Sequence, residues 1–600
     1  PRVRARSWVM RKGSVIFGIE SVHASLDADP PMNQHRSFPM AEGTSVLRTS
    51  IRSLDDQAPL PRDRFIVADQ PDDEALPMDV VFVGGGPAGL AGAIELARLV
   101  RKDNESGDGV GEVEIAVLEK AGQLGEHNLS GAVVNPSAFK ELFPDLLMDD
   151  LPFRRPVTKE AVYVLTESNS YRIPTPPTMK NHGNWIASIS EIVRWMGEQA
   201  EGLGVNVFPG FPVDALLIEE DNVIGVRTTP SGLGRDGESA SADAMPAVDL
   251  TARVTVLSEG TRGSLSQAWL DWKGITSENP QIFALGVKEI WEVKKPLDRI
   301  IHTMAWPLPK DAFGGSFMYP MSDSTVAVGL VVGLDYADAR FDVHDSLQRM
   351  KLHPLFREVL EGGELVEWGA KTIPEGGYYS VPKERHGDGL IIVGDAAGYV
   401  EVSSLKGIHY AMHSGIMAAR QIFDALKKGD TSRQALAGYT TAVDQSMIMK
   451  DLKATRNMRL AFKSGFYSGG VKAGLMTVTG GAFPGGKISI EEDAAETKRL
   501  ASEPSKVVPD GKLTFSKVDA VYKSGNQTRD DIPSHLVIGE DVSAEAAEMY
   551  VHLCPAGVYE RDGDKLVVNA PNCIDCKATD VLGPRWTPRE GGSGPAYRQM

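Results

Sequence analysis

The chain contains 600 residues with a mass of 64.8 kDa, which is past the size at which one hydrophobic core stops growing and favours two to four packed units. Hydrophobic residues at 42% and charged residues at 24% are typical of a globular protein and exclude global disorder. The 63 Lys and Arg residues against 81 Asp and Glu residues leave a net charge of −18, which opposes binding to nucleic acid or a general affinity for an anionic bilayer.

Residues 1–77 form an N-terminal extension in this interpretation, either targeting sequence or partly disordered. No acidic residue precedes Glu20, while five basic residues do: Arg2, Arg4, Arg6, Arg11 and Lys12. This pattern is typical of an organelle transit peptide, and an untranslated extension before a start at Met40 would look the same. Nowhere in the chain does a window approach the ~18 consecutive apolar residues of a spanning helix, so we expect no transmembrane segment.

A strand, a glycine turn and a helix are predicted over residues 78–99. The turn reads Gly84-x-Gly86-x-x-Gly89, and the next predicted strand ends on Glu119. Glycines at this spacing let a helix N-terminus approach a pyrophosphate, and a carboxylate after the second strand accepts hydrogen bonds from a ribose. The alternative is an ordinary glycine turn with a surface glutamate. The flanking strand and helix favour a dinucleotide site.

Two later motifs indicate that the dinucleotide is FAD. Glu259-Gly260 follows a predicted strand, and Gly394-Asp395 follows another, with a helix predicted at 408–426. The three motifs in this order are the signature of FAD enzymes of the glutathione-reductase and hydroxylase type, so the fold class is α/β (α+β) with a Rossmann-like FAD-binding fold. Because the sequence holds no second dinucleotide fingerprint, no nicotinamide site is evident.

All three cysteines lie in the last tenth of the chain, which excludes a disulfide framework and points to a metal site in a reduced compartment. Cys554-Pro555 and Cys573-x-x-Cys576 have the form of a bacterial ferredoxin half, in which a further cysteine should stand three residues later. That position is Thr579. A zinc site and a set of inert buried cysteines are the alternatives to an iron–sulfur cluster.

From about residue 78 onward the chain resembles the electron transfer flavoprotein:ubiquinone oxidoreductase family. The segments that carry this resemblance are GGGPAGLAGAIELARL, LEKAGQLGEHNLSGAVVNPSAFKELFP, LGVKEIW, HTMAWPL, FGGSFMYPM, GLVVGLDY, EGGYYSVPK, GIHYAMHSG, CPAGVYE, NCIDCK and GGSGPAY. The resemblance implies electron transfer from reduced electron transfer flavoprotein, through a 4Fe–4S cluster and FAD, to ubiquinone at a membrane that the enzyme enters from one side.

The resemblance also implies further site residues and a division into domains. Ser130, Gly131 and Gly407 would contact FAD, and the backbone amides of Gly314 and Gly315 would reach ubiquinone. The expected domains are an FAD-binding domain at 78–280 and 382–430, an antiparallel-sheet ubiquinone domain at 281–381, a helical membrane-associated segment at 431–503, and a ferredoxin-like iron–sulfur domain at 504–600.

The sequence departs from the family pattern at two positions. The family has a fourth cysteine where this chain has Thr579, so an oxygen of Thr579 or Asp580, or water, would face the fourth iron, or the cluster would hold three irons or be absent. The family often places a small hydroxyl residue near the flavin where this chain has Ile408.

Two apolar segments suit contact with a bilayer, because ubiquinone is nearly insoluble in water. The first is 130–147 and the second is 460–484, in which lysines are the only charged residues. Core packing is the alternative for both segments. No residue can be assigned from the sequence as the acid or base that protonates the quinone.

Two rival functions remain open at this stage. An FAD-dependent monooxygenase or prenyl reductase would have the same FAD fold, and a non-catalytic membrane-associated flavoprotein would follow from a degraded cluster site. The location expected is the inner membrane. The isoelectric point of about 5.2 and the Gly-Asp-Ala-Ala-Gly form favour the cytoplasmic face in a bacterium, and the matrix face of mitochondria is the eukaryotic alternative.

Overall fold

The structure is a computed structural model, and it describes most of the chain beyond residue 49. The described residues are 36–39, 50–107, 109–240, 242, 244–404, 406–483, 485–501 and 507–600, with the backbone alone at 36–39 and at 466–467. The basic residues of the expected targeting segment and Met40 lie outside the described residues. Among the described residues, no helix combines the length and the apolar composition needed to cross a bilayer.

A six-stranded sheet forms the centre of the first layer of the molecule, and its strands are short and, except for the edge strand β12, buried. Its order is β12-β6-β5-β16-β23-β22, with all pairs parallel except the last. Strands buried on both faces are continuously apolar, as in the Val-Val-Phe-Val of β5. The bounds are β12 (Asn206–Pro209), β6 (Ile115–Glu119), β5 (Val80–Val83), β16 (Val254–Leu257), β23 (Leu390–Ile392) and β22 (His386–Gly387).

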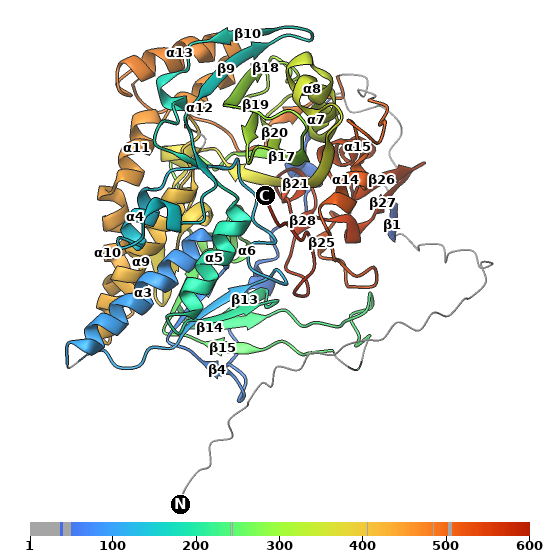
Figure 1. The fold of residues 1–600 in the computed structure, drawn as a ribbon. Coiled ribbons are helices and arrows are strands. Elements are labelled where there is room, and N and C mark those ends of the chain that lie inside the picture. The colour runs from blue at the N-terminus through green and yellow to red at the C-terminus, as the bar shows by residue number, and fades with distance from the viewer. Residues whose placement is uncertain are drawn as a thin grey trace, which may run out of the picture.

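Helices α3 (Pro87–Glu105), α5 (Ile189–Glu201) and α9 (Ile408–Lys428) share one buried core with this sheet, and Figure 1 shows the three helices near one another. Helices α3 and α9 lie in contact, because Gly415 brings the two backbones together. A Cβ at Gly415 would lie 2.1 Å from the carbonyl oxygen of Ala88. The predicted glycine turn and the two predicted helices are therefore confirmed, each within a few residues of its expected bounds.

A seven-stranded sheet forms the second layer, with the order β10-β9-β18-β19-β20-β17-β21. Its pairs are antiparallel except β9 with β18. Strands β9 and β10 come from inside 78–280, so this sheet also includes chain from outside the expected 281–381 region. The bounds are β9 (Glu160–Leu165), β10 (Ser170–Ile173), β17 (Phe283–Glu292), β18 (Ile300–Ala305), β19 (Gly314–Pro320), β20 (Thr325–Gly333) and β21 (Glu364–Pro374).

Part of the expected N-terminal extension belongs to the fold. Strands β3 (Ile66–Val67) and β4 (Leu76–Pro77) form the two edges of a five-stranded sheet, and β2 (Ile51–Arg52) pairs with β24 (Thr497–Lys498). The described residues from 50 to 77 are thus not a separate segment. The remaining strands of the five-stranded sheet are β13 (Val213–Glu219), β14 (Asn222–Thr228) and β15 (Asp249–Thr251).

The C-terminal region packs on one face of the seven-stranded sheet. Val287, Trp291 and Leu365 of that sheet share a buried core with Tyr550 and Cys554. Helix α7 (Val343–Leu352) joins the same core. The elements of this region are α14 (Lys517–Lys523), β25 (Leu536–Val537), α15 (Ala544–Leu553), β26 (Tyr559–Asp562), β27 (Lys565–Val568), α16 (Ala578–Leu582) and β28 (Arg585–Trp586).

Along the chain, four helices lie between the two sheets and the C-terminal region. They run up one side of the molecule in Figure 1. They are α10 (Arg433–Gln445), α11 (Met447–Thr455), α12 (Met458–Ala461) and α13 (Phe466–Val478). The mixed α/β class, with an FAD-type parallel sheet beside a largely antiparallel one, agrees with the sequence prediction.

Candidate functional site

A cavity of about 340 Å³ lies between the carboxyl ends of the parallel strands and the seven-stranded sheet. Ligands bind at this edge in open α/β sheets. The cavity brings together motifs that are more than 300 residues apart in the sequence. The predicted cofactor residues that line it are Gly84, Gly86, Glu119, Ser130, Gly131, Glu259, Gly260, Gly394, Asp395 and Gly407.

The glycine turn forms one end of the cavity. Gly84 has φ +109°, and a Cβ there would lie 2.4 Å from the carbonyl oxygen of Ser258. Gly86 caps α3 without a side chain, which leaves the backbone N–H groups of the helix open to the cavity. Gly89 does not line the cavity, because its Cα packs against the carbonyl of Gly84, 2.3 Å from where a Cβ would stand. These features fit the pyrophosphate of a dinucleotide.

Glu119 ends β6 with a buried and oriented carboxylate. Its Oε2 accepts the Gly85 N–H at 2.9 Å, and its Oε1 accepts the Ala121 N–H at 2.9 Å. Each oxygen keeps a lone pair, which is what hydrogen bonds from a ribose require.

Glu259 and Asp395 differ in what their carboxylates do. The Glu259 carboxylate accepts the N–H groups of Leu265 and Ser266 at 3.1 and 2.8 Å, so it caps helix α6 (Ser264–Trp272). Asp395 faces the cavity, and burial raises the pKa of its carboxyl to about 6 against the opposing effects of Lys371 and Thr261. Asp395 is therefore the freer of the two carboxyl groups toward a ligand.

The start of helix α9 closes the cavity on another side. Gly407 is its N-cap, without a side-chain cap, and Ile408 lines the cavity as the first helical residue. Ser130 and Gly131 line it from the loop before β7 (Val133–Val134). An apolar side chain at 408 leaves the helix N-terminus with backbone donors alone.

Gly314 and Gly315 lie at the start of β19, outside the described lining of the cavity. A Cβ at Gly314 would lie 2.1 Å from the Val331 oxygen, and one at Gly315 would lie 2.4 Å from the Thr303 oxygen. Close approach of neighbouring strands therefore explains both glycines. Val331 pairs with Gly315 and does line the cavity, so the two positions are one strand away from it.

The three cysteines gather beneath the edge of β21. Burial raises the pKa of Cys573 to about 12. Burial also raises the pKa of Cys576, with smaller contributions from the neighbouring Cys554 and Cys573. Cys554 and Cys576 belong to one buried core and Cys573 packs against it. A cation among the three thiols would favour their thiolate forms.

Thr579 joins this group through helix α16. Its Oγ1 lies 3.4 Å from the Tyr559 hydroxyl. Burial raises the pKa of Tyr559, and the charges of Cys554 and Cys573 add to this effect. The Asp580 carboxylate has other partners, because it accepts hydrogen bonds from Arg262 Nε at 2.6 Å and from the backbone N–H of Trp586 at 3.0 Å. The chemistry of the donor set is that of an iron–sulfur site with three thiols, and Thr579 offers a hydroxyl group where a fourth thiol is expected.

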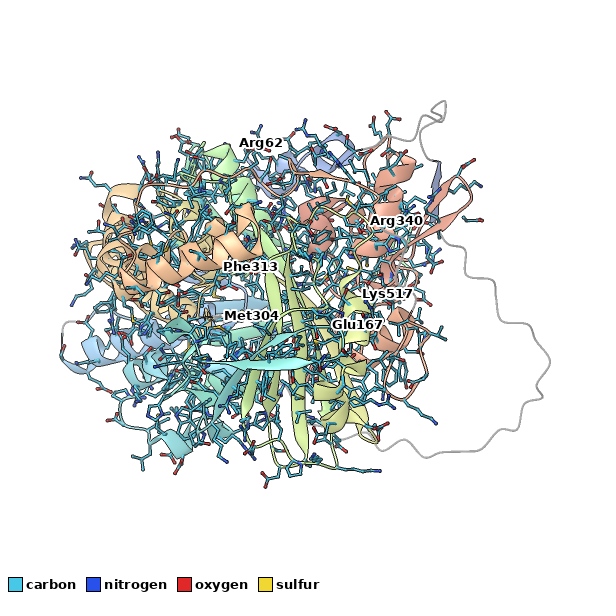
Figure 2. The ribbon with its side chains drawn as sticks, turned by 90° about the horizontal axis from the view of Figure 1, so that it is seen from above. Arg62, Glu167, Met304, Phe313, Arg340 and Lys517 are labelled. Atoms are coloured by element: carbon cyan, nitrogen blue, oxygen red, sulfur yellow. The ribbon has the colours of Figure 1, made fainter. Side chains whose placement is uncertain are left out.

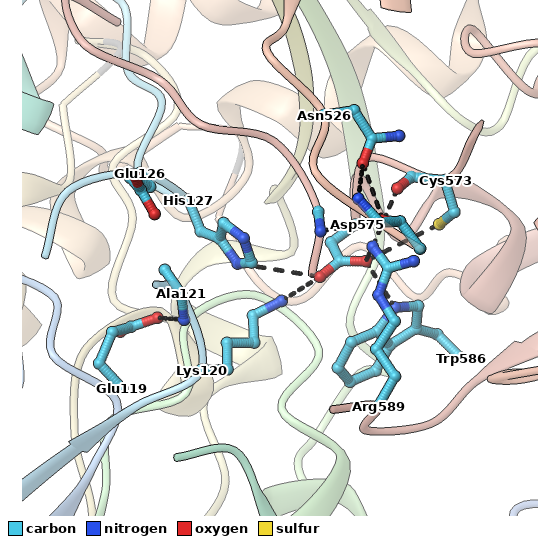
Figure 3. A network of polar contacts seen from close by, with 12 residues as sticks. Glu119, Lys120, Ala121, Glu126, His127, Asn526, Cys573, Asp575, Trp586 and Arg589 are labelled. Carbon is cyan, nitrogen blue, oxygen red and sulfur yellow. Dashed lines mark hydrogen bonds and ion pairs between the residues drawn. The ribbon is translucent and has the colours of Figure 1, made fainter. Parts of the chain in front are cut away.

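Asp575 stands between the two cysteines at the centre of a buried polar network, which Figure 3 shows. Its carboxylate accepts Lys120 Nζ at 2.5 Å, Arg589 Nη2 at 2.8 Å and Trp586 Nε1 at 3.0 Å. Burial opposes the ionised form, yet the charges of Arg589 and Lys120 hold the pKa of Asp575 well below its usual value. The Cys573 sulfur lies 3.8 Å from the same carboxylate. The sequence analysis missed this residue, although its place inside the Cys-x-x-Cys motif was a signal.

His535, Cys573 and Asp575 place donor atoms within 4.8 Å of one another. A single metal ion there would share the Asp575 carboxylate with two positive charges, those of Lys120 and Arg589. Because like charges repel strongly in a buried site, Lys120 and Arg589 oppose the binding of a single metal ion by this group.

Lysines from several distant elements also face the cavity, and none of them was predicted as a site residue. Burial lowers the pKa of Lys288 to about 7 and that of Lys371 to about 8. Lys288 Nζ has no hydrogen-bond partner among the described residues. Together these side chains favour an anionic ligand. The lysines that line the cavity are Lys120, Lys288, Lys371, Lys406 and Lys577.

The two apolar segments differ in exposure. In 130–147 the side chains of Phe139, Leu142 and Phe143 are buried, and the exposed apolar residues are Leu146 and Leu147. The expectation that this whole segment meets a bilayer was therefore wrong for its helix, α4 (Ser137–Leu142), which packs into the core. In 460–484 the exposed apolar side chains lie on α13 and just beyond it: Val471, Leu475, Val478 and Phe483.

Comparison with known proteins decides the family. The family model described as "ETF-QO, ubiquinone-binding" matches residues 283–373, and "Electron transfer flavoprotein-ubiquinone oxidoreductase, 4Fe-4S" matches 511–598. The mitochondrial electron transfer flavoprotein-ubiquinone oxidoreductase of Oryza sativa is 38% identical over 552 residues, covering 88% of this chain and 94% of that protein. The chain belongs to the electron transfer flavoprotein-ubiquinone oxidoreductase family.

Membership in the electron transfer flavoprotein-ubiquinone oxidoreductase family confirms the resemblance seen in the sequence. The human mitochondrial member is 36% identical over 564 residues, covering 87% of this chain and 89% of that protein. All three cysteines and Thr579 lie inside the matched 4Fe-4S region, and Gly314 and Gly315 lie inside the matched ubiquinone-binding region.

A solved structure supports the FAD-type fold. A geranylgeranyl bacteriochlorophyll reductase-like protein from Thermoplasma acidophilum aligns with a TM-score of 0.52 at 17% identity, covering 68% of this chain and 92% of that one. At that identity the likeness concerns the fold alone.

Proposed function

We propose that this chain oxidises reduced electron transfer flavoprotein and reduces ubiquinone, using FAD and an iron–sulfur centre. The observation that carries the proposal is that the cavity and the cysteine loop share a wall. Thr372 lines the cavity, and its N–H donates to the Cys576 carbonyl at 3.0 Å. The Lys371 ammonium lines the cavity and donates to the Asp575 carbonyl at 3.1 Å.

In this proposal the residues around the cavity hold FAD, which supplies two-electron redox chemistry when bound. The backbone at Gly84 and Gly86 binds the pyrophosphate, and Glu119 accepts the ribose hydroxyl groups. Asp395 accepts a ribityl hydroxyl, while Gly260, Gly394 and Gly407 admit the cofactor close to the backbone. Glu259 acts indirectly, because its carboxylate holds the N-terminus of α6.

The cysteine loop holds the iron–sulfur centre, which supplies one-electron transfer when bound. Cys554, Cys573 and Cys576 provide sulfur ligands, and the hydroxyl of Thr579 faces the fourth corner. Asp575 orients the loop through Lys120 of the FAD-binding sheet, since that ion pair spans the two parts of the chain. Gly314 and Gly315 border the ubiquinone site.

We also propose that α13 enters one leaflet of the membrane. The exposed fractions of Val471 and Val478 are 66% and 86%, which is unusual for apolar side chains and marks an interaction surface. In this proposal the protein is bound to an inner membrane. The acidic composition favours the cytoplasmic face in a bacterium, with the mitochondrial matrix face as the eukaryotic counterpart. The net charge of −18 leaves nucleic acid out of the proposed partners.

Steady-state assays of the purified protein test the proposal. Reduced electron transfer flavoprotein with a soluble ubiquinone analogue should give quinol, and NADPH in its place should give none. Oxidation of NADPH would instead favour the monooxygenase or reductase alternative. Absence of quinol formation with either reductant, in protein that holds FAD, would favour the non-catalytic alternative.

A further inference from the structure

A buried cluster of charged side chains borders the cavity at the end of β21. Arg459 of α12 donates from Nε to the Glu375 carboxylate at 2.6 Å and from Nη2 to the Asp335 carboxylate at 2.8 Å. The side chains of Arg459, Glu375 and Asp335 are 4–5% exposed. Glu375 also lines the cavity. One guanidinium therefore bridges a carboxylate at the cavity to a carboxylate behind it.

The cluster continues from Asp335 to the surface. Lys463 lies 2.9 Å from the second Asp335 oxygen and 2.8 Å from Glu496. The side chains of Lys463 and Glu496 are 22% and 33% exposed. A connected series of ionic contacts, each below 3 Å, thus runs from solvent to the cavity.

The same cluster touches the region assigned to ubiquinone. The Arg459 guanidinium lies 4.4 Å from the centre of the Phe313 ring, and Phe313 directly precedes Gly314. The Phe313 ring lies 5.0 Å from that of Phe462, which follows α12. Figure 2 shows Phe313 beside the helices of this segment. Glu375 is therefore linked through Arg459 to Phe313, which directly precedes β19, and Phe313 in turn contacts Phe462, which lies between α12 and α13.

Reduction of a quinone to a quinol consumes two protons with two electrons, so the site needs a proton source. An efficient donor is a buried acid within reach of the substrate and with a pKa moved toward neutrality. The other carboxyl groups of the cavity have different roles in the proposed function, because Asp395 accepts a ribityl hydroxyl, Glu259 caps α6 and Glu119 accepts two backbone N–H groups.

We propose that Glu375 donates the protons for quinone reduction and that Arg459 is the positioning residue that holds it at the cavity. This rests on the proposed function. In each transfer the O–H bond of the Glu375 carboxyl breaks and an O–H bond forms at a quinone oxygen. The carboxylate regains a proton from solvent before the second transfer, so two protons balance the two electrons supplied by the reduced flavoprotein partner.

The groups around Glu375 suit this role. Burial raises the pKa of Glu375, and the negative charge of Asp335 adds to this effect. Arg459 opposes the rise and stabilises the carboxylate that remains after a transfer. The acid is therefore held protonated to a higher pH than a free glutamate, and its ionised form still has a partner.

Glu375→Gln tests the proposal, because glutamine keeps the size of the side chain and an acceptor for Arg459 but has no proton to give. Quinol formation should fall about 100-fold. FAD content and flavin reduction by dithionite should match the parent protein. The matched control is Asp249→Asn, which changes a buried carboxylate paired with Arg227 at 2.8 Å but outside the cavity lining. Quinol formation in the control should stay within about twofold of the parent.

The outcomes separate the inference from the function on which it rests. A parent protein that forms no quinol overturns the proposed function itself. An active parent together with a Glu375→Gln variant of unchanged rate overturns only the role of Glu375. If Glu375→Gln does not retain FAD, Glu375→Asp decides. A shifted pH profile of quinol formation in that variant supports proton donation, and an unshifted profile overturns it.

Discussion

The flavin cavity and the cysteine loop lie against each other but are built in different ways. Backbone geometry forms one part of the cavity, with glycines where strands and helices end, and charged side chains, among them five lysines, complete the lining. A few side chains form the cysteine loop: three thiols, one hydroxyl and a buried carboxylate with two cationic partners. A site formed by the backbone tolerates sequence changes elsewhere in the chain. A site formed by side chains can lose a ligand by a single substitution. Thr579 is such a position.

The largest effect should come from filling the glycine turn. Gly84→Val should leave less than a tenth of the parent's FAD per chain, because φ is +109° and the new Cβ would lie 2.4 Å from the Ser258 oxygen. The measurement is FAD released on denaturation. Gly470→Ala is the control, since its Cβ meets nothing within 4 Å among the described residues. Retention of FAD by Gly84→Val would contradict a backbone-built site.

In the cysteine loop, the corresponding substitution is Thr579→Cys. The parent protein should hold an altered or labile cluster with fewer than four irons per chain, because a hydroxyl is a poor ligand for a soft iron–sulfur centre. The variant should reach four irons and show a conventional reduced-cluster EPR signal. Iron analysis and EPR of dithionite-reduced protein check this. Four irons and a normal signal in the parent would show that oxygen suffices.

Membrane binding should depend on α13 rather than on the buried helix α4. Replacing Val471, Leu475 and Val478 together by Ser should release the protein from lipid vesicles, since a fully buried side chain of this size contributes about 1.5–3 kcal/mol. The free energy of unfolding should change by only about 0.5 kcal/mol per substitution, because the side chains are exposed. Cosedimentation with vesicles and urea unfolding give the two values. Unchanged cosedimentation would mean that α13 is not the contact.

A smaller effect is expected at the ion pair that joins the two sites. Lys120→Met should lower the free energy of unfolding by about 2 kcal/mol, since it removes a charged hydrogen bond from buried Asp575. Urea unfolding measures this, and Lys102→Met on the exposed face of α3 is the control. An unchanged unfolding free energy would show that Arg589 alone compensates Asp575.

The Asp575 carboxylate predicts that the free energy of unfolding depends on pH. The folded pKa of Asp575 lies well below its unfolded value, so its contribution is complete above about pH 4. That contribution is lost as the pH falls from there toward the folded pKa. Unfolding midpoints of the parent between pH 6 and pH 3 should therefore drop more steeply than those of Asp575→Asn. Parallel curves would exclude Asp575 as the group responsible.

Sequence reasoning was most informative where a local pattern has one physical meaning. The Gly84-x-Gly86-x-x-Gly89 turn, the carboxylate after β6 and the Gly394-Asp395 turn all line one cavity, apart from Gly89, which packs beneath it. It was less successful with carboxylates whose partners are distant in the chain. Glu259 has the expected position, but its oxygens bind the N-terminus of α6. The partners of Asp575, Lys120 and Arg589, come from segments that no pattern connects with the cysteines.

By itself, the sequence determined the cofactor class, the order of the FAD motifs and the incomplete set of cysteines, because these follow from residue types at short spacing. Only the tertiary structure decided which apolar segment is exposed, because 130–147 and 460–484 have similar composition and differ in what packs over them. It also decided which buried acid is available at the cavity. Glu375 differs from other glutamates only in its surroundings, since burial and the contact with Arg459 come from chain segments 84 residues apart.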